Sequence, residues 1–497
     1  MKIAIAYPPL ESEKGVPLLG QNRQFQWAHD PWTAYPMVPA YAATMLKNAG
    51  YKVIWLDGIA GEQTYSEWLS DVKKEKPDLL MIETKTPVIK RHWKIISDIK
   101  KLETGNWKLD ICLVGDHVTA LPEESFKNSK VDYILTGGDY DFLLLNLANY
   151  LSKGEKLESG IWYRTEIRNT KYEIRNTGKF KLNHDLNSLP MIDRELTKWQ
   201  LYAYKNSNYL QKPGTYTMFG RDCWWGKCVF CSWTTLYPGA QFRVMSPKRA
   251  LDEVGYILQH TCVREIMDDS GTFPVGDWLR EFCKGMIKRG YNQKIKIDCN
   301  MRFNSDLTQK DYDLMAKAGF RFLLYGLESA NQKTLDRLNK NLRVEQITTG
   351  VRMAKKAGLC PHATVMVGYP WETKEDAIQT LELAKKFFCE GLIDSLQATV
   401  VIPYPGTPLF KECEENDWLK TKDWDRYDMK EPVMKTVMSN EEILGMVRSI
   451  YSAIWSPQFV VRKLKEGLTD WNTFKYYTAL GWKFISKRID FKKTGIN

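Results

Sequence analysis

The sequence lacks any run of about 18 consecutive apolar residues, which is the length that a helix needs to cross a bilayer. Its opening residues are apolar only as far as Pro8 and Pro9, whereas the apolar core of a signal peptide is longer. We therefore expect a first β-strand at this point and a cytoplasmic protein without a transmembrane helix.

Clustered cysteines are also scarce. Seven of the ten cysteines stand alone, mostly in apolar segments, where a thiol packs like a small hydrophobic side chain. This scatter argues against a disulfide framework. Only Cys223, Cys228 and Cys231 lie close together, so metal binding is expected at this one position.

A strong excess of charge is absent as well, because a net charge of +11 is moderate for 497 residues. This charge is compatible with an anionic substrate, a nucleic acid, an acidic membrane surface or simply a lysine-rich surface in water. It therefore selects no partner. The length exceeds what one compact core accommodates, so we expect two or three domains.

Residues 1–150 alternate short apolar runs with amphipathic stretches such as 40–49, which ends before Gly50. Alternating strands and helices predict βαβ units and a parallel sheet. Five strands suit a flavodoxin-like, Rossmann-type α/β domain, whose ligands bind beyond the carboxyl ends of the strands. The expected strands are residues 2–7, 52–56, 79–82, 110–114 and 133–135.

Residues 151–210 are expected to form a linker. They carry the polar sequence Glu-Ile-Arg-Asn-Thr twice, at 166–170 and at 173–177. The repeat is too short and too polar to bury a core, which excludes a solenoid and favours a surface insertion.

Residues 211–410 contain a second series of alternating elements, and residues 411–497 are expected to be a helical C-terminal region. Six β-then-α repeats predict a partial (β/α)6 barrel, in which chemistry takes place on the loops after the strands. The cysteine loop and several acidic residues fall there. The expected strands are residues 216–219, 265–267, 294–298, 320–325, 363–367 and 396–402, with the clearest helices at 307–318 and 344–357.

The cysteine loop carries the strongest chemical signal. Cys223, Cys228 and Cys231 share a short stretch that includes Gly226, so the loop can curl and turn three sulfurs inward. Three thiolates on a 4Fe–4S cluster would leave one iron without a protein ligand, which is typical of a catalytic metal site. A zinc knuckle with a distant fourth ligand and an electron-transfer cluster remain alternatives, although the chain has neither a second Cys/His pair nor a fourth clustered cysteine.

This segment resembles the cluster loop of the radical S-adenosylmethionine (SAM) enzymes, which commonly reads Cys-x3-Cys-x2-Cys with an aromatic residue before the last cysteine. Phe230 stands at the aromatic position, but four residues instead of three separate Cys223 from Cys228. The resemblance implies a 4Fe–4S cluster whose open iron chelates SAM, and one-electron reduction of SAM to a 5′-deoxyadenosyl radical. No side chain is assigned as catalytic from the sequence.

Other segments of the expected barrel resemble the SAM-binding segments of this family. Residues 325–329 look like its Gly-x-Glu-Ser segment, residues 365–372 like the segment near the adenine, and residues 268–270 stand where the methionyl amino group is bound. A helix N-terminal acid is the alternative interpretation of the glutamate at 328. The residues that the resemblance implies in SAM binding are Phe230, Asp268, Asp269, Ser270, Glu328, Ser329, Gly368 and Glu372.

The N-terminal region resembles the cobalamin-binding domains attached to some radical SAM enzymes, in residues 39–53, 114–122 and 131–139. The sequence Asp-x-His-x-x-Gly, by which other cobalamin proteins place a histidine on cobalt, is absent, so His117 is not expected to be a lower ligand. A domain that keeps the fold without binding a corrin remains the alternative. The corrin-binding residues that the resemblance implies are Pro8, Glu83, Thr84, Gly115, Asp116, His117, Gly137 and Gly138.

Three hypotheses about function follow. The first is a cobalamin-dependent radical methyltransferase that adds a methyl group to an unactivated carbon. The second is a radical oxidative cyclase, cross-linking or rearrangement enzyme on the same scaffold. The third is an iron–sulfur protein that binds a cluster without turnover, and the presence of chemically suited residues after six strands disfavours it.

The substrate is expected to be a small molecule or a lipid, and an electron donor such as flavodoxin or ferredoxin is expected as a partner. The last stretch interleaves aromatic residues, such as Trp471 and Trp482, with lysine and arginine. It could make peripheral contact with an anionic membrane, form a helical cap on the barrel, or stack on nucleic-acid bases. Trp424 belongs to a Trp-Asp-Arg-Tyr-Asp segment that resembles one found after the barrel in related enzymes.

Overall fold

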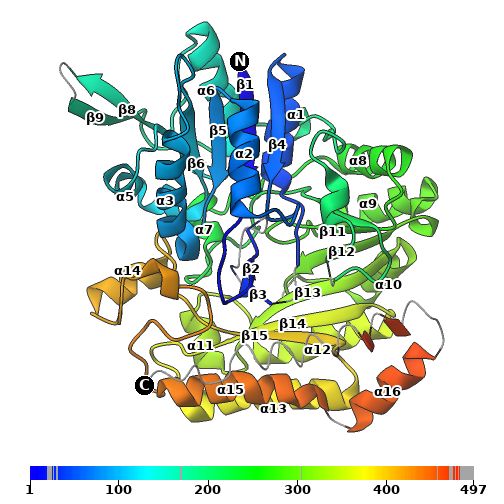
Figure 1. Ribbon diagram of the computed structural model, residues 1–497. Helices are drawn as coiled ribbons and strands as arrows, with labels where there is room; N and C mark the ends of the chain where they lie inside the picture. Colours follow the sequence, from blue (N-terminus) through cyan, green and yellow to red (C-terminus); the bar gives the residue numbers. More distant parts are fainter. Residues whose placement is uncertain are drawn as a thin grey trace.

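The computed structural model describes residues 1–497 except 20–24, 26, 30–31, 168–170, 207, 304, 456, 469–473, 476, 479–480 and 482–497. Figure 1 shows an N-terminal sheet with its helices in the upper half and a second sheet with its helices in the lower half. A short ribbon of β2 (Val16–Pro17) and β3 (Trp27–Ala28) appears between them in both ribbon views. The expected α/β class, with a Rossmann-type sheet followed by a second parallel sheet, is confirmed.

The N-terminal sheet has the strand order β4-β1-β5-β6-β7-β8-β9, and every pair from β4 to β7 is parallel. The first five strands therefore follow the 2-1-3-4-5 order of flavodoxin-like folds. They are β1 (Lys2–Tyr7), β4 (Lys52–Asp57), β5 (Leu79–Glu83), β6 (Asp110–Val114) and β7 (Tyr133–Leu135). All five expected strands are confirmed within one residue at either end.

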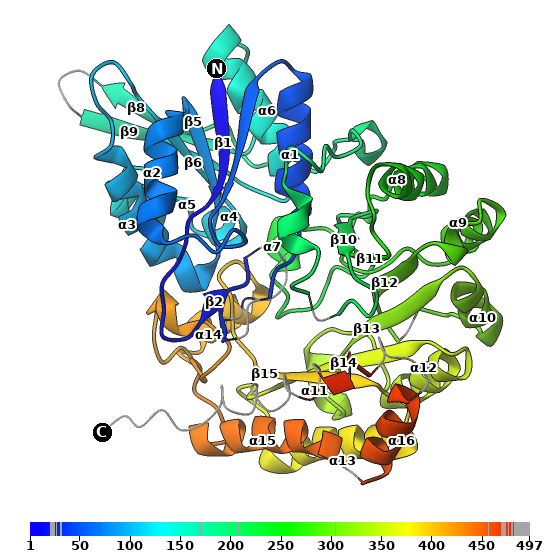
Figure 2. The ribbon, with the colours of Figure 1, turned by 45° about the vertical axis from the view of Figure 1, so that its right-hand side comes forward.

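Helices cover both faces of this sheet (Figure 2), which explains why β1 and β5 are almost continuously apolar. The elements are α1 (Met37–Asn48), α2 (Tyr65–Glu75), η1 (Thr86–Val88), α3 (Ile89–Lys100), α4 (Asp116–Ala120), α5 (Pro122–Asn128) and α6 (Tyr140–Lys153). The loops that follow the strands lie together at one edge, because the carboxyl ends of parallel strands meet there.

An antiparallel hairpin of β8 (Ile161–Ile167) and β9 (Lys171–Asn176) extends the N-terminal sheet beyond β7. Of the repeated polar pentapeptide, residues 166–167 belong to β8 and residues 173–176 to β9. Sequence patterning assigns these residues to a linker because a mostly polar ribbon at a sheet edge buries little apolar surface. Only the segment with the short turns η2 (Leu186–Ser188) and η3 (Trp199–Tyr202) then leads to the second sheet.

The second sheet consists of six parallel strands in sequential order, as a partial (β/α)6 barrel requires. They are β10 (Gly214–Thr217), β11 (Glu265–Asp268), β12 (Lys296–Met301), β13 (Phe320–Glu328), β14 (Cys360–Val367) and β15 (Ser395–Val400). The expected third strand was placed too early, so Cys299 and Asn300 lie inside β12 instead of after it. β10 also ends two residues before its expected end.

Several helices of this half begin at a residue whose side chain caps them. Thr308 accepts a hydrogen bond from the Asp311 N–H, and the Asp311 side chain accepts from the Thr308 N–H, which satisfies two unpaired donors at the start of α10. Such caps fix where each loop ends. The helices are α7 (Trp233–Leu236), α8 (Pro247–His260), α9 (Asp277–Lys288), α10 (Gln309–Lys317), α11 (Gln332–Arg337), α12 (Val344–Lys356) and α13 (Lys374–Glu390), with η4 (Tyr291–Gln293).

The described part of the C-terminal region is mainly helical, as expected, and it packs on the barrel. Its described elements are α14 (Pro408–Glu415), η5 (Trp424–Arg426), α15 (Asn440–Ser452), η6 (Ala453–Trp455) and α16 (Pro457–Gly467). The Lys463 ammonium of α16 lies 2.5 Å from an Asp394 oxygen, just before β15 begins. This contact agrees with a cap on the amino end of the barrel. Trp471 and Trp482 lie outside the described residues.

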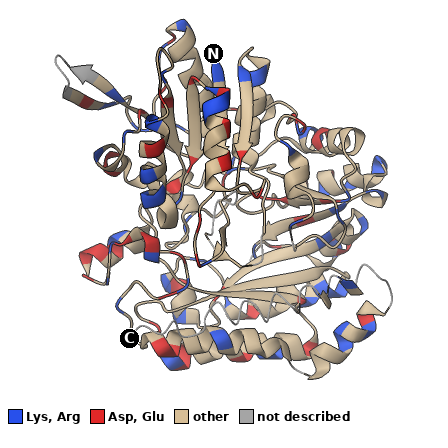
Figure 3. Cartoon of the chain, viewed as in Figure 1, with Lys and Arg blue, Asp and Glu red and all other residues tan. Residues whose placement is uncertain are grey.

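In the view of Figure 3, positively and negatively charged residues are interspersed along the outer helices. The net positive charge therefore does not gather into a single patch in this view. Within the described ranges, no helix combines the length and the apolar character that crossing a membrane demands.

Candidate functional site

The three cysteines lie in the loop between β10 and α7, at the carboxyl end of the first barrel strand. Gly226 has a left-handed backbone conformation with a φ of 57°, which lets the loop reverse between Cys223 and Cys228. An added Cβ would lie 2.8 Å from the Cβ of Ala240, so a larger residue would strain the turn twice. Cys228 is buried, whereas Cys223 and Cys231 are partly exposed.

Backbone contacts hold the cysteine loop against the far side of the barrel. Val229 donates its N–H to the Leu338 carbonyl at 3.1 Å and accepts from the Leu409 N–H at 2.9 Å. Trp225 donates its indole N–H to the Asn339 carbonyl at 2.6 Å. The loop is therefore fixed to the residues that follow α11 and to the start of α14, and it does not depend on a ligand alone for its shape.

Arg302 reaches the same loop just after β12. Its guanidinium carbon lies 5.1 Å from the ring centroid of Trp224 and 5.4 Å from that of Trp225. Its Nη1 lies 3.7 Å from Cys228 Sγ, and its Nη2 donates to the Lys340 carbonyl. Burial raises the pKa of the Cys228 thiol, while the charges of Lys340 and Arg302 oppose this rise. Two cations thus favour the thiolate, which is the form that binds metal.

The donor set is chemically suited to an iron–sulfur cluster, because thiolates are the protein ligands of such clusters. Within the residues that the structure describes, no three or more Cys, His, Asp or Glu side chains are close enough to share one metal ion. Three soft sulfur donors on one curled loop, with cations beside them, therefore fit the cluster that the sequence predicts.

Glu328, the last residue of β13, faces Lys340 in a buried ion pair of 3.0 Å. Its φ of 65° is unusual for a residue with a side chain, and the register of β13 and β14 shifts at the same position. An added Cβ at Gly326 would lie 2.4 Å from Glu328 Oε1 and 2.9 Å from Lys340 Nζ. The Gly-x-Glu spacing therefore makes room for this pair.

The ion pair of Glu328 lies beside the cysteine loop, because Lys340 Nζ is also 5.9 Å from the ring centroid of Phe230. The alternative interpretation of Glu328 as a helix N-terminal acid is wrong, since α11 begins later and its cap is Asn331. Ser329, the next residue, is buried. Sequence reasoning therefore selected an acid that the fold holds in a strained conformation near the cluster loop, where strain is typical of functional sites.

The segment of Asp268, Asp269 and Ser270 is fully buried at the end of β11. The Asp268 carboxylate accepts hydrogen bonds from Thr217 Oγ1 and the Phe219 N–H, each at 3.0 Å. Burial raises the pKa of Asp268 to about 7, although these hydrogen bonds and those of Ser270 oppose the rise. Asp268 therefore ties the start of the cysteine loop to β11, and direct contact with SAM stays a prediction.

Glu372 folds back onto the loop after β14. Its Oε2 accepts from the Gly368 N–H at 2.8 Å, while its buried Oε1 has no hydrogen-bond partner. Burial raises the pKa of Glu372 to about 8, against the hydrogen bonds from Gly368 and Tyr369. The carboxyl group is thus held largely neutral at pH 7 and shapes the loop that the sequence assigns to adenine binding.

Tyr369 is a residue that sequence reasoning did not select. Its buried hydroxyl has no hydrogen-bond partner. Burial raises the pKa of this hydroxyl, and the charges of Glu328, Glu372 and Cys228 add to the rise, which indicates that it lies near all three. A buried hydroxyl without a partner in this group fits a polar ligand such as SAM.

Lys340 was missed as well, because it follows α11 in a short polar loop without any periodic signal. Asn339 and Asn341 on either side have positive φ angles of 51° and 50°. Asparagine tolerates this conformation better than most residues, so the Asn-Lys-Asn sequence was the one available indication of a tight turn.

The predicted corrin-binding residues gather at the carboxyl edge of the N-terminal sheet, after β1, β5, β6 and β7. Pro8, Glu83 and Thr84 are buried there. Tyr7 donates its hydroxyl proton to Glu83, and Thr84 Oγ1 lies 2.7 Å from His92 Nδ1. Burial raises the pKa of Glu83, and the charge of the buried Lys85 opposes the rise.

His117 is fully buried, and both of its ring nitrogens have partners within the chain. Nδ1 lies 3.2 Å from Thr86 Oγ1, and Nε2 lies 3.1 Å from Glu124 Oε2. Trp424 packs edge-on against the imidazole at 5.4 Å and donates its indole N–H to Glu124 at 2.9 Å. Both ring nitrogens thus have partners within the chain, and the role of His117 toward a corrin stays a prediction.

At each of the three predicted glycines of this edge, other residues of the chain fill the space that a side chain would take. An added Cβ would lie 2.2 Å from the Thr84 carbonyl at Gly115, 2.4 Å from the Phe180 ring at Gly137, and 2.0 Å from the Tyr237 ring at Gly138. Each glycine is therefore required by internal packing. Their sequence signal does not by itself indicate a ligand.

Polar groups without partners remain elsewhere at this edge. The hydroxyls of Tyr404 and Thr235, which come from the barrel half of the chain, are buried without hydrogen-bond partners. Burial raises the pKa of Tyr404, and the charge of Asp116 adds to the rise, which indicates that a barrel loop meets the N-terminal edge here. Such groups fit a ligand with many amide groups, so the residues around Glu83 and Asp116 remain compatible with a corrin.

The Trp424 segment, for which the sequence offered no role, connects the two halves of the molecule. Lys90 of α3 lies 2.8 Å from Asp423 and 3.1 Å from Asp425. Lys14, in the segment before β2, lies 2.5 Å from the buried Asp428. The segment after the barrel therefore fastens onto the loops of the N-terminal sheet.

Fold and site together define an iron–sulfur enzyme of the radical SAM type. Residues 217–384 match the family model described as the radical SAM superfamily. The chain contains a radical SAM domain, and it is a radical SAM enzyme. This class implies a 4Fe–4S cluster and SAM as cofactors, and Cys223, Cys228 and Cys231 are the residues that suit the cluster.

Among curated proteins, the chain is similar to an uncharacterized methyltransferase of Pyrococcus horikoshii. The two are 26% identical over 487 residues, which cover 94% of this chain and 95% of the relative. The chain is also 25% identical over 422 residues to an anaerobic magnesium-protoporphyrin IX monomethyl ester cyclase of Rubrivivax gelatinosus, covering 84% of this chain and 73% of that protein.

Among solved structures, the chain resembles the cobalamin-dependent radical SAM enzyme OxsB, determined with aqua-cobalamin and SAM bound. The TM-score is 0.69 at 16% identity, covering 98% of this chain and 71% of that chain. It also resembles the radical SAM methyltransferase TsrM of Kitasatospora setae, with a TM-score of 0.65 at 14% identity over 92% of this chain and 89% of that one. At these identities the likeness shows the fold, which extends over both sheets.

Proposed function

We propose that this protein is a cobalamin-dependent radical methyltransferase that transfers a methyl group to an unactivated carbon. One observation carries the proposal: the carboxyl edges of the two parallel sheets face each other. The Gly138 N–H, after β7, donates to the Leu236 carbonyl of α7 at 3.0 Å, and Trp424, in the segment after the barrel, donates its indole N–H to Glu124 at 2.9 Å. Ligands of both sheets would then share one interior, as ligands bind at these edges.

The residues of the barrel would divide the work at its mouth. The three thiolates would hold the cluster, and Glu328 with Lys340 would receive the polar part of SAM. When bound, the cluster supplies one electron to the sulfonium of SAM. Phe230, Tyr369 and the neighbouring tryptophans would enclose the reacting atoms and exclude water, which protects a radical from side reactions.

The N-terminal edge would hold the corrin through Pro8, Glu83, Thr84 and Asp116, with the Tyr404 hydroxyl facing Asp116 from the barrel. When bound, the corrin supplies the methyl group. Gly115, Gly137 and Gly138 would shape this edge through internal packing, and His117 would stay a buried hydrogen-bonding residue.

The relatives support this proposal. Besides the P. horikoshii methyltransferase, a bacteriochlorophyllide d C-12(1)-methyltransferase of Chlorobaculum tepidum is 23% identical over 256 residues, which cover 50% of this chain and 53% of that protein. The structural neighbours OxsB and TsrM are described with cobalamin bound. The proposed substrate is a small molecule or a lipid, and the proposed electron donor is a flavodoxin or ferredoxin. The proposed location is the cytoplasm.

A radical oxidative cyclase is the second candidate, because the Rubrivivax relative with its substantial coverage is named as a cyclase. Both candidates use the same cluster and the same radical. They differ in the product, which gains a methyl group in one case and a ring in the other.

The test begins with protein prepared anaerobically with cobalamin and reconstituted with iron and sulfide. Corrin and iron content are measured first, and the enzyme is then incubated with a strong reductant, methyl-deuterated SAM and a cell extract of small molecules and lipids. We expect one corrin per chain, formation of 5′-deoxyadenosine and a product that carries the labelled methyl group. Deoxyadenosine formation with unlabelled, dehydrogenated product would favour the cyclase, and unchanged turnover without cobalamin would contradict the proposal.

A further inference from the structure

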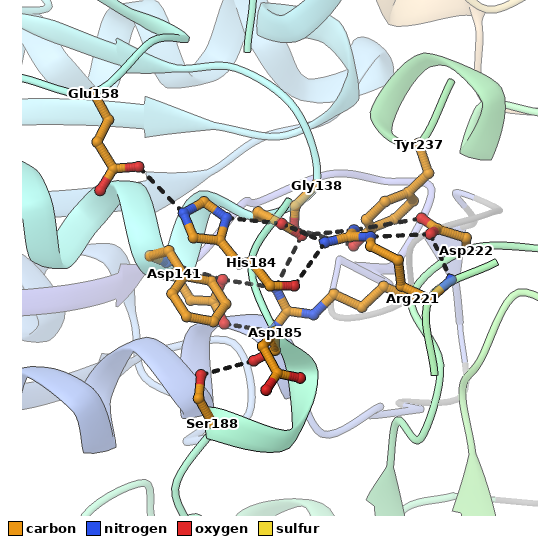
Figure 4. Close-up of polar contacts among 12 residues, drawn as sticks. Gly138, Asp141, Glu158, His184, Asp185, Ser188, Arg221, Asp222 and Tyr237 are labelled. Carbon is orange, nitrogen blue, oxygen red and sulfur yellow. Dashed lines mark hydrogen bonds and ion pairs between the residues drawn. The ribbon is translucent and has the colours of Figure 1, made fainter. Parts of the chain in front are cut away.

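A buried network of charges lies where the cysteine loop meets the N-terminal sheet (Figure 4). Arg221, two residues before Cys223, is only 1% exposed. Its Nη1 donates to Asp141 Oδ1 at 2.7 Å, and its Nη2 donates to Asp141 Oδ2. This two-pronged contact is the strongest geometry that an arginine and a carboxylate form. It joins the barrel to the first turn of α6.

Asp139 extends the network to a second arginine. It lies 3.3 Å from Arg221 Nη1 and 2.7 Å from Arg243 Nη1, and its Oδ2 is 3.0 Å from His184 Nδ1. Arg243 in turn lies 3.1 Å from Asp222, the residue directly before Cys223. Asp139 and Asp141, at the start of α6, thus bind Arg221 directly, and Arg243 links Asp139 to Asp222. Arg221 and Asp222 are the two residues that precede the first cluster cysteine.

The other end of the cysteine loop meets the same N-terminal residues. The Tyr237 hydroxyl, at the end of α7, donates to the Gly138 carbonyl at 3.1 Å, and the Gly138 N–H donates to Leu236. An added Cβ at Gly138 would lie 2.0 Å from the Tyr237 ring. Residues 138–141 therefore hold the chain immediately before Cys223 and again a few residues after Cys231.

We propose that Asp139, Asp141 and Arg221 are positioning residues for the iron–sulfur cluster, through which the N-terminal domain fixes the shape of the cysteine loop and tunes the reduction potential of the cluster. The inference rests on the assignment of the cluster to the three cysteines, but it requires neither methyl transfer nor bound corrin. It predicts that residues of one domain alter a cofactor held by the other.

Energetics favour a purpose beyond stability for this network. A buried ion pair is seldom more stable than well-packed apolar residues of the same size, because each charge loses its hydration. What charges provide is a defined geometry and an electric field. Both matter for a cluster, since its potential depends on nearby net charge and on the placement of its ligands.

The charges make opposite predictions for opposite substitutions. Asp141→Asn removes a negative charge and keeps the shape of the side chain, so the reduced cluster is stabilised and its midpoint potential rises. Arg221→Gln removes a positive charge, so the potential falls. A residue that only holds the fold together would not produce shifts of opposite sign.

The experiment compares anaerobically reconstituted full-length wild type with D141N, R221Q and R221K. Midpoint potentials are measured by redox titration followed by electron paramagnetic resonance, and the rate of iron loss to a chelator is measured in parallel. We expect a higher potential in D141N, a lower one in R221Q, and faster iron loss in both. R221K keeps the charge but not the two-pronged contact, so its potential should stay near wild type while its iron loss is faster.

The matched control is Asp394→Asn, which removes a buried, ion-paired acid at the amino end of the barrel, where Lys355 lies 2.7 Å and Lys463 2.5 Å away. Its potential should equal that of wild type even if the protein unfolds more readily. Equal potentials in D141N and wild type, or shifts of one sign in D141N and R221Q, would overturn the inference. If R221Q does not fold, D141N and R221K decide. Wild type that takes up no cluster would instead contradict the assignment of the cysteines.

Discussion

The two parallel sheets of this chain end in different kinds of edge. At the barrel, Cys223 and Cys231 remain partly exposed, Glu328 is held at a strained φ, and the Tyr369 hydroxyl has no partner. At the N-terminal sheet, the glycines and His117 are closed in by other parts of the chain. At the N-terminal edge, internal contacts therefore occupy the glycines and His117, although the unpartnered Tyr404 hydroxyl lies beside it. At the barrel edge, strain and an unpartnered hydroxyl occur among the site residues themselves.

This difference separates two sources of a sequence signal. A glycine or histidine after a strand can be required by packing alone, as Gly138 is required by the Tyr237 ring. Strain and unpartnered polar atoms cost free energy in the unliganded protein and are therefore better indications of a ligand. Substitutions at both edges test this distinction.

Removing a cluster thiolate should have the largest effect. Cys228→Ala is expected to abolish reductive cleavage of SAM and to prevent uptake of a complete cluster. With only two thiolates, a second iron of the 4Fe–4S cluster would lack a protein ligand. Iron content and 5′-deoxyadenosine formation measure this. The control is Cys262→Ser, an exposed lone cysteine, and equal losses in both variants would contradict the assigned site.

Filling the space beside Glu328 should come next. Gly326→Ala places a Cβ against both partners of the Glu328–Lys340 pair, and forcing extra atoms into a packed site costs about 1–3 kcal/mol. Displaced partners should therefore raise the KM for SAM roughly 10-fold or more, because about 1.4 kcal/mol corresponds to a factor of ten. Gly445→Ala on α15, where the added Cβ meets only Arg448 at 3.8 Å, should leave the KM unchanged.

The pH dependence of stability should reveal the buried Glu372. Its pKa is raised from 4.5 to about 8, so the folded protein binds more protons than the unfolded chain between these values. Stability therefore falls as the pH rises from about 4.5 to 8, by up to a few kcal/mol. In Glu372→Gln this part of the slope should vanish in denaturant unfolding curves, whereas Glu375→Gln, at an exposed site, should keep it. Parallel slopes in wild type and E372Q would argue against a neutral buried acid.

Packing at the N-terminal edge should respond more modestly. Gly138→Ala is expected to lower the free energy of unfolding by about 1–3 kcal/mol, since the Tyr237 ring must move. Tyr237→Phe removes only the hydrogen bond to Gly138 and should cost about 1 kcal/mol. Urea titrations of the apo-protein measure both. An alanine at 138 that leaves stability intact would mean that this glycine serves a ligand after all.

The smallest effect is expected for the exposed ion pairs between the halves. Lys90→Ala removes contacts with Asp423 and Asp425, whose side chains are partly exposed, so stability should change by no more than about 1 kcal/mol. Thermal unfolding of the two proteins side by side measures the change. A larger loss would show that this connection matters as much as the buried ones.

The sequence predicted the two sheets well because their strands are buried on both faces. Long apolar runs such as β5 (Leu79–Glu83) leave little choice of structure. It missed β8 and β9, which contain many polar residues and lie at the end of the sheet, where β9 pairs with β8 alone. Boundaries shifted where a strand carries polar residues toward the site, as at Asn300 in β12.

The candidate site was predictable where spacing reflects chemistry. The spacing of the three cysteines lets their sulfurs converge on one cluster. The Gly-x-Glu pattern leaves room for the ion pair of Glu328. Lys340, Tyr369 and Arg302 complete the site from separate loops, and only the folded partial barrel brings them together. The network of Arg221 depends on contacts 80 residues apart along the chain, a separation that no local pattern can encode.

The hairpin of β8 and β9 determines how the long sheet ends. An outermost strand leaves a row of backbone donors and acceptors unpaired, which invites another strand to join. Here the last strand carries the charged side chains of Glu173 and Arg175 in the open and exposes 59% of Tyr172. Alternating charges on so short a ribbon disfavour pairing with a strand of another molecule. A change in the length of the hairpin would leave the facing edges of the two sheets unchanged.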